Sequence, residues 1–255
     1  MLNLKCIKSL GIELEMFATK RINEKQIVYN ATEEVKNIFG FSINPNFTTN
    51  FLHLNNLKIV TDGTVFEFQK LFIDYYDINL NVDIFRRDLE SLFKNSFLNK
   101  YHMSPIAFFK NGRYIVFDSS NNVYSSGKMM YNAYTGTHRY EEKKEGDKLV
   151  DFRTTGLHLH FEFTNPVEDL NTNNIVKTLD KIYEDYFPND ISPVMQEREK
   201  YIIRGDYRLK YQSNGITTLE YRRLAPGFLF DKNKLETFLY LADAELNKII
   251  KVNEN

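Results

Sequence analysis

Excess charge of one sign and cysteine are both scarce in this chain of 255 residues. Its 33 lysines and arginines face 34 aspartates and glutamates, which gives a formal net charge of −1. This balance excludes a broad electrostatic field for nucleic acid or membrane, although a local site can still bind a phosphorylated ligand. The single cysteine, Cys6, excludes an intrachain disulfide and fits a reducing cytosol, and its apolar neighbours favour a core role over a nucleophilic one.

Long apolar runs, leader-like segments and linkers are also missing. No stretch approaches the roughly 20 apolar residues of a membrane helix, and residues 1–8 lack the apolar core of a signal peptide. We therefore expect a soluble, cytoplasmic protein with no membrane or nucleic-acid partner. Because no internal repeat and no proline- or glycine-rich linker divides the chain, residues 1–255 are expected to form a single domain.

Three common catalytic signatures are absent as well. The chain contains no Walker A motif, and no G-x-G-x-x-G follows a strand, so a nucleotide would be held through metal and arginine rather than a glycine cradle. No G-x-S-x-G is present either, which leaves serine catalysis poorly supported.

Four short segments in which charged residues alternate with apolar ones stand out against these absences. They span residues 11–17, 62–69, 156–163 and 219–224. Because successive side chains of a strand point to opposite faces, each segment is typical of a strand with one polar and one apolar face. The first and third would share these polar side chains on one face: Glu13, Glu15, His158, His160 and Glu162. Such a face indicates a metal-dependent active site.

Helical periodicity predicts four helices around these strands. Three cover about residues 24–39, 81–98 and 173–186, and the last begins near Asp231 as N-cap. Helices on the back of an antiparallel sheet that is wet on its other face give an α+β domain.

Two turn signals and one charged stretch complete this outline. Residues 110–112 and 212–215 each predict a hairpin between short flanking strands. Residues 139–148 carry mixed charge and predict a mobile loop, and their position before the histidine strand leaves a lid open as an alternative.

Residue type alone leaves more than one interpretation of the glutamate pair and of the histidine pair. Glu13 and Glu15 would stand about 7 Å apart along a strand, which suits two neighbouring hard cations, although an exposed acidic edge is the plain alternative. His158 and His160 can form a metal pair. With Glu162 they could hold a hydrolytic zinc, or they could simply be hydrogen-bonded within the sheet.

Guanidinium groups gather near the fourth segment. Glu220 and Arg222 share a strand face, and Arg204, Arg208 and Arg223 lie close in sequence. Such groups grip phosphate or carboxylate, although any one of them alone is more often part of a surface salt bridge. Carboxylates for Mg²⁺ together with arginines for anions are the composition of a nucleoside triphosphate site.

In this order the segments resemble the glutamine synthetase / glutamate–cysteine ligase superfamily, and within it the small phage-encoded COOH·NH2 ligases, or amidoligases. The resemblance spans about residues 9–226. It rests on G-x-E-x-E at 11–15, D-G-x3-E at 62–67, G-L-H-x-H at 156–160 and L-E-Y-R at 219–222, with a weaker likeness at 118–124.

The resemblance implies a curved antiparallel sheet with helices behind it, which is the glutamine-synthetase-like catalytic fold. If the protein is phage-encoded, the resemblance also implies that it is located in the host cytoplasm. It implies ATP-dependent coupling of a carboxylate to an amine through an acyl phosphate, with two or more Mg²⁺ ions. The implied metal ligands are Glu13, Glu15, Glu67, His158 and Glu220.

Further roles follow from the same resemblance. Arg222 would contact phosphate or stabilise the transition state, and His160 would face the nucleotide or substrate. Arg204 and Arg208 would take phosphate or the substrate carboxylate, and Asp62 would shape a turn or bind the incoming amine.

Several matters stay open at this stage. The alternatives are a metal-dependent hydrolase and a non-enzymatic binding or assembly protein on the same fold. The acid and amine could be an amino acid, a peptide or a protein side chain, and superfamily members range from rings to smaller assemblies, which leaves homo-oligomers open. Gln69 and Lys70 follow Glu67 with no further assignable acid, so the number of metal ions is undecided.

Overall fold

The structure is a computed structural model of the whole chain. It describes residues 6–22, 25–39, 52–54, 57–62, 65–72, 78–108, 114–117, 129–140, 152–188, 199, 202–211 and 215–252.

Among the described residues, a large sheet of twelve strands organises the molecule, and nine of these strands form one antiparallel path. In sheet order they are β10 (Thr137–Tyr140), β9 (Met129–Asn132), β13 (Asp206–Tyr211), β14 (Thr217–Leu224), β12 (Leu157–Phe163), β1 (Ile7–Ile22), β5 (Val65–Phe72), β4 (Leu57–Asp62) and β3 (Leu52–Leu54). The other three are β2 (Lys25–Tyr29), β6 (His102–Ser104) and β8 (Tyr114–Phe117). A separate pair consists of β11 (Phe152–Thr154) and β7 (Ile106–Phe108).

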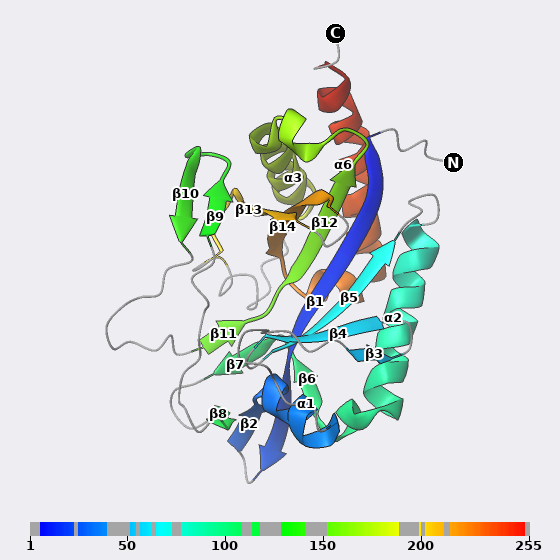
Figure 1. Cartoon of the computed structure of the whole chain (residues 1–255), viewed down its shortest axis with the longest axis vertical. Coiled ribbons are helices and arrows are strands. Elements are labelled where there is room, and N and C mark those ends of the chain that lie inside the picture. Colours follow the sequence, from blue (N-terminus) through cyan, green and yellow to red (C-terminus); the bar gives the residue numbers. More distant parts are fainter. Residues whose placement is uncertain are drawn as a thin grey trace.

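Strand β1 is the spine of this sheet and runs diagonally through the molecule (Figure 1). Its first part lies between β12 and β5, and its last residues pair with β2 and β6 instead. The strand therefore joins the part of the sheet that carries the polar segments to the part at the other end of the molecule.

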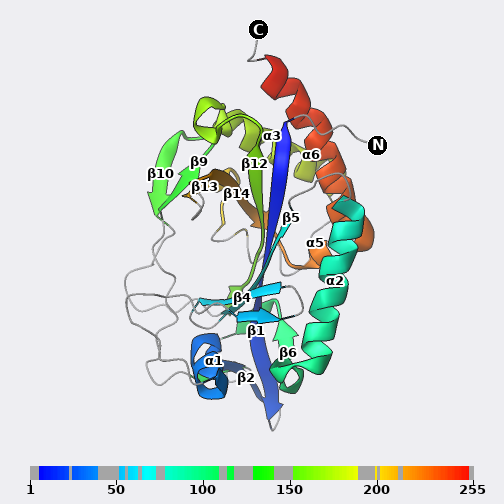
Figure 2. The ribbon, with the colours of Figure 1, turned by 45° about the vertical axis from the view of Figure 1, so that its right-hand side comes forward.

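Helices cover the apolar face of the sheet. They are α2 (Ile78–Asn95), α3 (Thr172–Tyr186), α5 (Gly227–Phe230) and α6 (Lys232–Val252). Figure 2 shows α2 and α6 standing together on one side of β1. Ring contacts mark the packing: Phe68 of β5 meets Phe93 of α2, with centroids 5.3 Å apart, and Tyr221 of β14 stacks on Phe238 of α6 at 5.8 Å. Burial of this face supplies the main favourable term of folding.

The expected mixed α+β class with a large, curved antiparallel sheet is confirmed. The predicted alternation of faces is also confirmed, because apolar residues such as Ile12, Leu14, Leu159 and Phe161 all lie in the core. The face opposite the helices, called the front face below, was predicted to be exposed to water. This prediction is wrong for Glu13 and His158, which lie on that face and are buried. None of the described helices is long and apolar enough to cross a membrane.

Three of the four helix predictions are confirmed, with small boundary shifts, and one is wrong in its first half. Residues 25–29 form β2, and only Ala31–Phe39 is helical, as α1. The branched Val28 pairs across to Thr19 of β1, and Asn30 accepts a hydrogen bond from the Glu33 amide as an N-cap. The spacing of apolar residues here fits a helix as well as a strand, and pairing with β1 decides for the strand.

The two hairpin predictions have different outcomes. β13 and β14 pair antiparallel as expected, although residues 212–214 of their turn lie outside the described residues. In the part of the chain that the structure describes, β7 and β8 do not pair with each other. β7 pairs with β11, and β8 pairs in parallel with β2. The turn signal at 110–112, the segment 118–124 and residues 141–148 of the predicted loop lie outside the described residues, while Arg139 belongs to β10.

Asp243 of α6 is a carboxyl group that burial destabilises when it is charged. Its side chain is 3 % exposed, and Asn247 Nδ2 donates to its Oδ1 at 2.9 Å. Burial raises the pKa of Asp243 to about 6, and the Asn247 hydrogen bond only partly opposes the shift. The folded state thus binds more protons than the unfolded state between about pH 4 and 6, so stability falls as pH rises through that window.

Asp243→Asn should therefore raise the free energy of unfolding at pH 7 by up to about 3 kcal/mol, since the amide still accepts from Asn247 and never ionises. Urea unfolding at pH 3.5 and pH 7 tests this. The gain should be absent at pH 3.5, and an equal effect at both pH values would contradict the burial argument.

Candidate functional site

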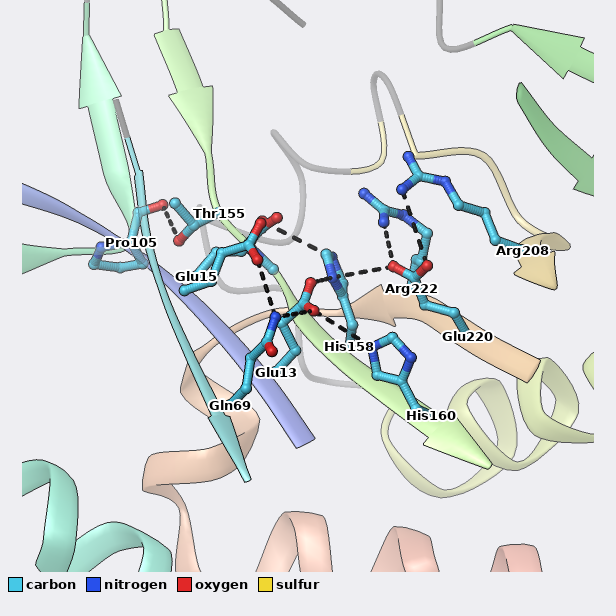
Figure 3. Close-up of polar contacts among 12 residues, drawn as sticks. Glu13, Glu15, Gln69, Pro105, Thr155, His158, His160, Arg208, Glu220 and Arg222 are labelled. Carbon is cyan, nitrogen blue, oxygen red and sulfur yellow. Dashed lines mark hydrogen bonds and ion pairs between the residues drawn. The ribbon is translucent and has the colours of Figure 1, made fainter. Parts of the chain in front are cut away.

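Glu13 lies at the centre of a buried polar cluster on the front face of the sheet (Figure 3). β1 places it opposite His158 of β12, and its Oε1 is 2.8 Å from His158 Nδ1. The same nitrogen is 3.4 Å from Oε1 of Glu220 on β14. Glu13, His158 and Glu220 each offer one ligand atom, and these atoms lie within 4.8 Å of one another, so the three side chains can hold one metal ion.

A second group of possible ligands shares Glu13. Glu15 lies opposite Glu67 of β5, and one carboxylate oxygen from each of Glu13, Glu15 and Glu67 lies within the same 4.8 Å limit. The Gly156 amide donates to Glu15 Oε2 at 2.9 Å. Gln69 Nε2 donates to Glu13 Oε2 at 2.9 Å and to Glu67 Oε2 at 3.1 Å. The sheet therefore offers two adjoining oxygen-rich sites with one carboxylate in common, as hard divalent cations require.

His160 lies on the same face as His158, one strand repeat further along β12. Its Nε2 is 3.5 Å from Glu13 Oε2, and neither of its buried ring nitrogens makes a hydrogen bond in the described structure. Gly11 of β1 lies directly opposite, and a Cβ there would come within 3.2 Å of His160 Cβ. The glycine of G-x-E-x-E therefore makes room for the imidazole.

Two arginines surround Glu220. Arg222 Nη1 donates a short hydrogen bond to Glu220 Oε1, and Arg208 Nη1 of β13 lies 3.9 Å from Oε2. Both guanidinium groups are largely buried beside the carboxylate. Burying these charges costs several kcal/mol unless they are paired, so Glu220 positions both arginines at the cluster.

A β-bulge near the end of β14 contains Arg222 and Arg223. β14 has Arg222 and Arg223 opposite the single residue His158. The extra residue returns Leu224 to the core, where it lies opposite Leu157. A bulge of this kind re-aims side chains next to a site. Here Arg222 faces the cluster and Arg223 contacts α3 on the other face, as strand alternation requires, and the extra residue lets Leu224 face the core as well.

The electrostatics leave Glu13, Glu220 and His158 in their metal-binding protonation states at neutral pH. Burial raises the pKa of Glu13, but contacts with His158 and His160 and the Lys210 charge outweigh it and hold the pKa well below its usual range. Burial also raises the pKa of Glu220, but the Arg222 charge and both histidines outweigh it and depress the pKa strongly. Burial and then the Arg222 charge lower the pKa of His158, so its imidazole is neutral.

The structure brings together all five side chains expected to bind metal, and places Arg222, Arg208 and His160 beside them. Arg204 lies elsewhere: its Nε contacts Glu184 at 2.7 Å, and its guanidinium covers the Tyr134 ring. Arg204 thus makes a local ion pair with α3, and its expected role in binding phosphate or the substrate carboxylate stays a prediction.

Three other residues from the sequence argument lie apart from the cluster or are only partly described. Glu162 contacts Lys8 at 2.6 Å and Ser9, so it does not join the two histidines. Arg223 contacts Asp180 on the opposite face of the sheet. Asp62 ends β4 opposite Val65, and its side chain lies outside what the structure describes, so its predicted role stays a prediction.

Sequence reasoning missed three residues that contact the cluster or lie beside it: Gln69, Lys210 and Lys58. Gln69 follows Glu67 by two residues, so strand alternation could have placed its amide on the same face. Lys210 follows Arg208 by the same spacing. Lys58 carries no such signal, because nothing in its local sequence shows that β4 lies beside β5 in the sheet.

Comparison of the chain with protein-family models, with curated proteins and with solved structures finds no match in any of the three.

Gly11→Ala should displace His160 and lower the free energy of unfolding by roughly 1 to 3 kcal/mol, because the new methyl group overpacks the strand pair. The matched control is Gly227→Ala, whose methyl group would have no neighbour within 4 Å. Urea unfolding of both variants is the measurement. Equal effects of the two substitutions would contradict the proposed close contact.

Proposed function

We propose that this protein is an ATP-dependent carboxylate–amine ligase of the amidoligase type, with a glutamine-synthetase-like catalytic fold. The observation that carries the proposal is the pair of ligand groups that share Glu13, with Arg222 and Arg208 beside them. Carboxylates, one imidazole and guanidinium groups on one sheet face are the donor set that a metal–triphosphate complex needs.

The donor set fits magnesium ions and a nucleotide. Glu13, His158 and Glu220 would hold one Mg²⁺, and Glu13, Glu15 and Glu67 a second. Glu220 Oε2 and both ring nitrogens of His160 are buried without a hydrogen bond in the described structure, which leaves polar atoms for a ligand. The bound ions would neutralise phosphate oxygens.

Charge balance supports the joint entry of metal and ATP. Within the described structure, the four glutamates of the cluster are balanced by four cationic side chains that contact it or act on its charges: Arg208, Arg222, Lys58 and Lys210. Two divalent cations alone would leave this buried site with an excess of four positive charges. The four negative charges of ATP remove that excess, so each ligand should strengthen binding of the other.

The reaction class joins an acid and an amine. A carboxylate oxygen of the acid takes the γ-phosphoryl group of ATP and releases ADP. The amine nitrogen then forms the C–N bond, loses a proton, and phosphate leaves with that oxygen. Arg222 is fixed by Glu220 next to the cluster, where its charge can stabilise the negative charge that develops on the transferring oxygens.

The separation of Glu162 from the cluster gives no support to a zinc hydrolase built on His158, His160 and Glu162. That glutamate instead supplies a control. It lies on β12, as His158 and His160 do, but it binds Lys8 rather than the two ligand groups.

The test combines calorimetric binding with turnover. Mg²⁺ and ATP should bind at least tenfold more tightly together than either does alone, and ADP release should require an amine from mixtures of amino acids, polyamines and peptides. Glu15→Gln should lower metal affinity and ADP release by roughly 10- to 100-fold, while Glu162→Gln should leave both unchanged.

Independent binding of Mg²⁺ and ATP, or equal behaviour of Glu15→Gln and Glu162→Gln, would contradict the ligase proposal. Hydrolysis of peptide or ester bonds without ATP would also contradict it and would favour a hydrolase.

A further inference from the structure

Lys210 reaches Glu13 from a strand that is not adjacent to β1. Its Nζ lies 3.3 Å from Glu13 Oε2, yet β13 is three strand positions from β1 in the sheet. In a flat sheet that separation would be about 14 Å, since neighbouring strands lie about 4.8 Å apart. Curvature of the sheet therefore carries Lys210 over its front face, and 42 % of the side chain stays exposed.

Lys58 approaches from the opposite side. It lies on β4 opposite Gln69, the residue that donates to both Glu13 and Glu67. Burial and then the Lys210 charge lower the pKa of Lys58, while the Glu13 and Glu67 charges oppose them. The charges of Glu13, Glu67 and Lys210 therefore all act on Lys58, which its register on β4 places beside this part of the cluster.

Five strand positions separate β13 from β4, about 24 Å in a flat sheet. The fold nevertheless brings the Lys210 ammonium to Glu13 and places Lys58 opposite Gln69, which donates to both Glu13 and Glu67. Burial lowers the pKa of Lys210, but the Glu13, Glu220 and Glu67 charges outweigh it and raise the pKa, so this ammonium remains charged.

Divalent cations would change the partners of both lysines. Once Glu13 and Glu67 bind metal, their charge is neutralised and two ammonium groups remain beside new positive charge. Each then needs another anion within reach of its four-carbon stem. Lysine binds phosphate as a point charge and does not require the fixed geometry of an arginine fork.

We propose that Lys58 and Lys210 form a two-sided ammonium clamp that binds the phosphoryl oxygens of a polyphosphate once metal ions have neutralised Glu13 and Glu67. This assignment rests on the proposed function and names two further residues for its nucleotide. Arg222 and Arg208 would hold the part of the ligand nearest Glu220, and the lysines the part nearest Glu67.

The test compares Lys58→Met, Lys210→Met and the double variant with the parent protein in calorimetric titrations. Methionine keeps an unbranched stem and removes the charge. The matched control is Lys8→Met, because Lys8 forms an ion pair with Glu162 outside the cluster. The probes are Mn²⁺ alone, Mg²⁺ with inorganic tripolyphosphate, and Mg²⁺ with ATP. A thermal melt of each variant checks that it is folded.

The double variant should bind Mg²⁺–tripolyphosphate and Mg²⁺–ATP at least tenfold more weakly than the parent. It should bind Mn²⁺ alone equally well or more tightly, because a competing cation has been removed from Glu13. Each single variant should show part of the loss, and Lys8→Met none of it.

Unchanged polyphosphate affinity in a folded double variant, or an equal loss of Mn²⁺ affinity, would overturn the clamp. If the parent binds tripolyphosphate through the lysines but does not bind ATP, the ligase proposal fails and the clamp stands. If the parent binds neither polyphosphate, both fail.

Discussion

The burial of the Glu13 carboxylate is the constraint on which the rest of the site depends. A charge removed from water costs several kcal/mol unless partners surround it. Glu13 meets this condition with His158 at one oxygen, and with Gln69 and Lys210 at the other. These partners come from β12, β5 and β13, so the contacts of this one side chain depend on the strand order and the curvature of the sheet.

The features around Glu13 serve the same arrangement. Gly11 leaves space for His160 across the strand pair, and the bulge in β14 returns Leu224 to the core after Arg222 has faced the cluster. Behind the sheet, Arg223 contacts Asp180 of α3, which ties β14 to the helical layer. A rigid apolar back thus supports a front face whose donors are balanced in charge and ready to exchange partners for a ligand.

Strand alternation was enough to predict which side chains share a face, because a period of two fixes it within each segment. It therefore placed Glu13, Glu15 and His158 together from sequence alone. It could not give the order or curvature of the strands, and so it gave no signal for Lys58 and could not show that Lys210, on the same face as Arg208, reaches Glu13. The same limit explains β2, whose residues show an apolar pattern that fits a helix until pairing with β1 decides otherwise.

The central claim is that Glu13 is shared by two cation sites, and anomalous diffraction from crystals grown with Mn²⁺ and ADP tests it most directly. The account predicts two manganese peaks that both contact Glu13, one also near His158 and Glu220, the other near Glu15 and Glu67. A single peak, or peaks that leave Glu13 without a metal, would contradict it.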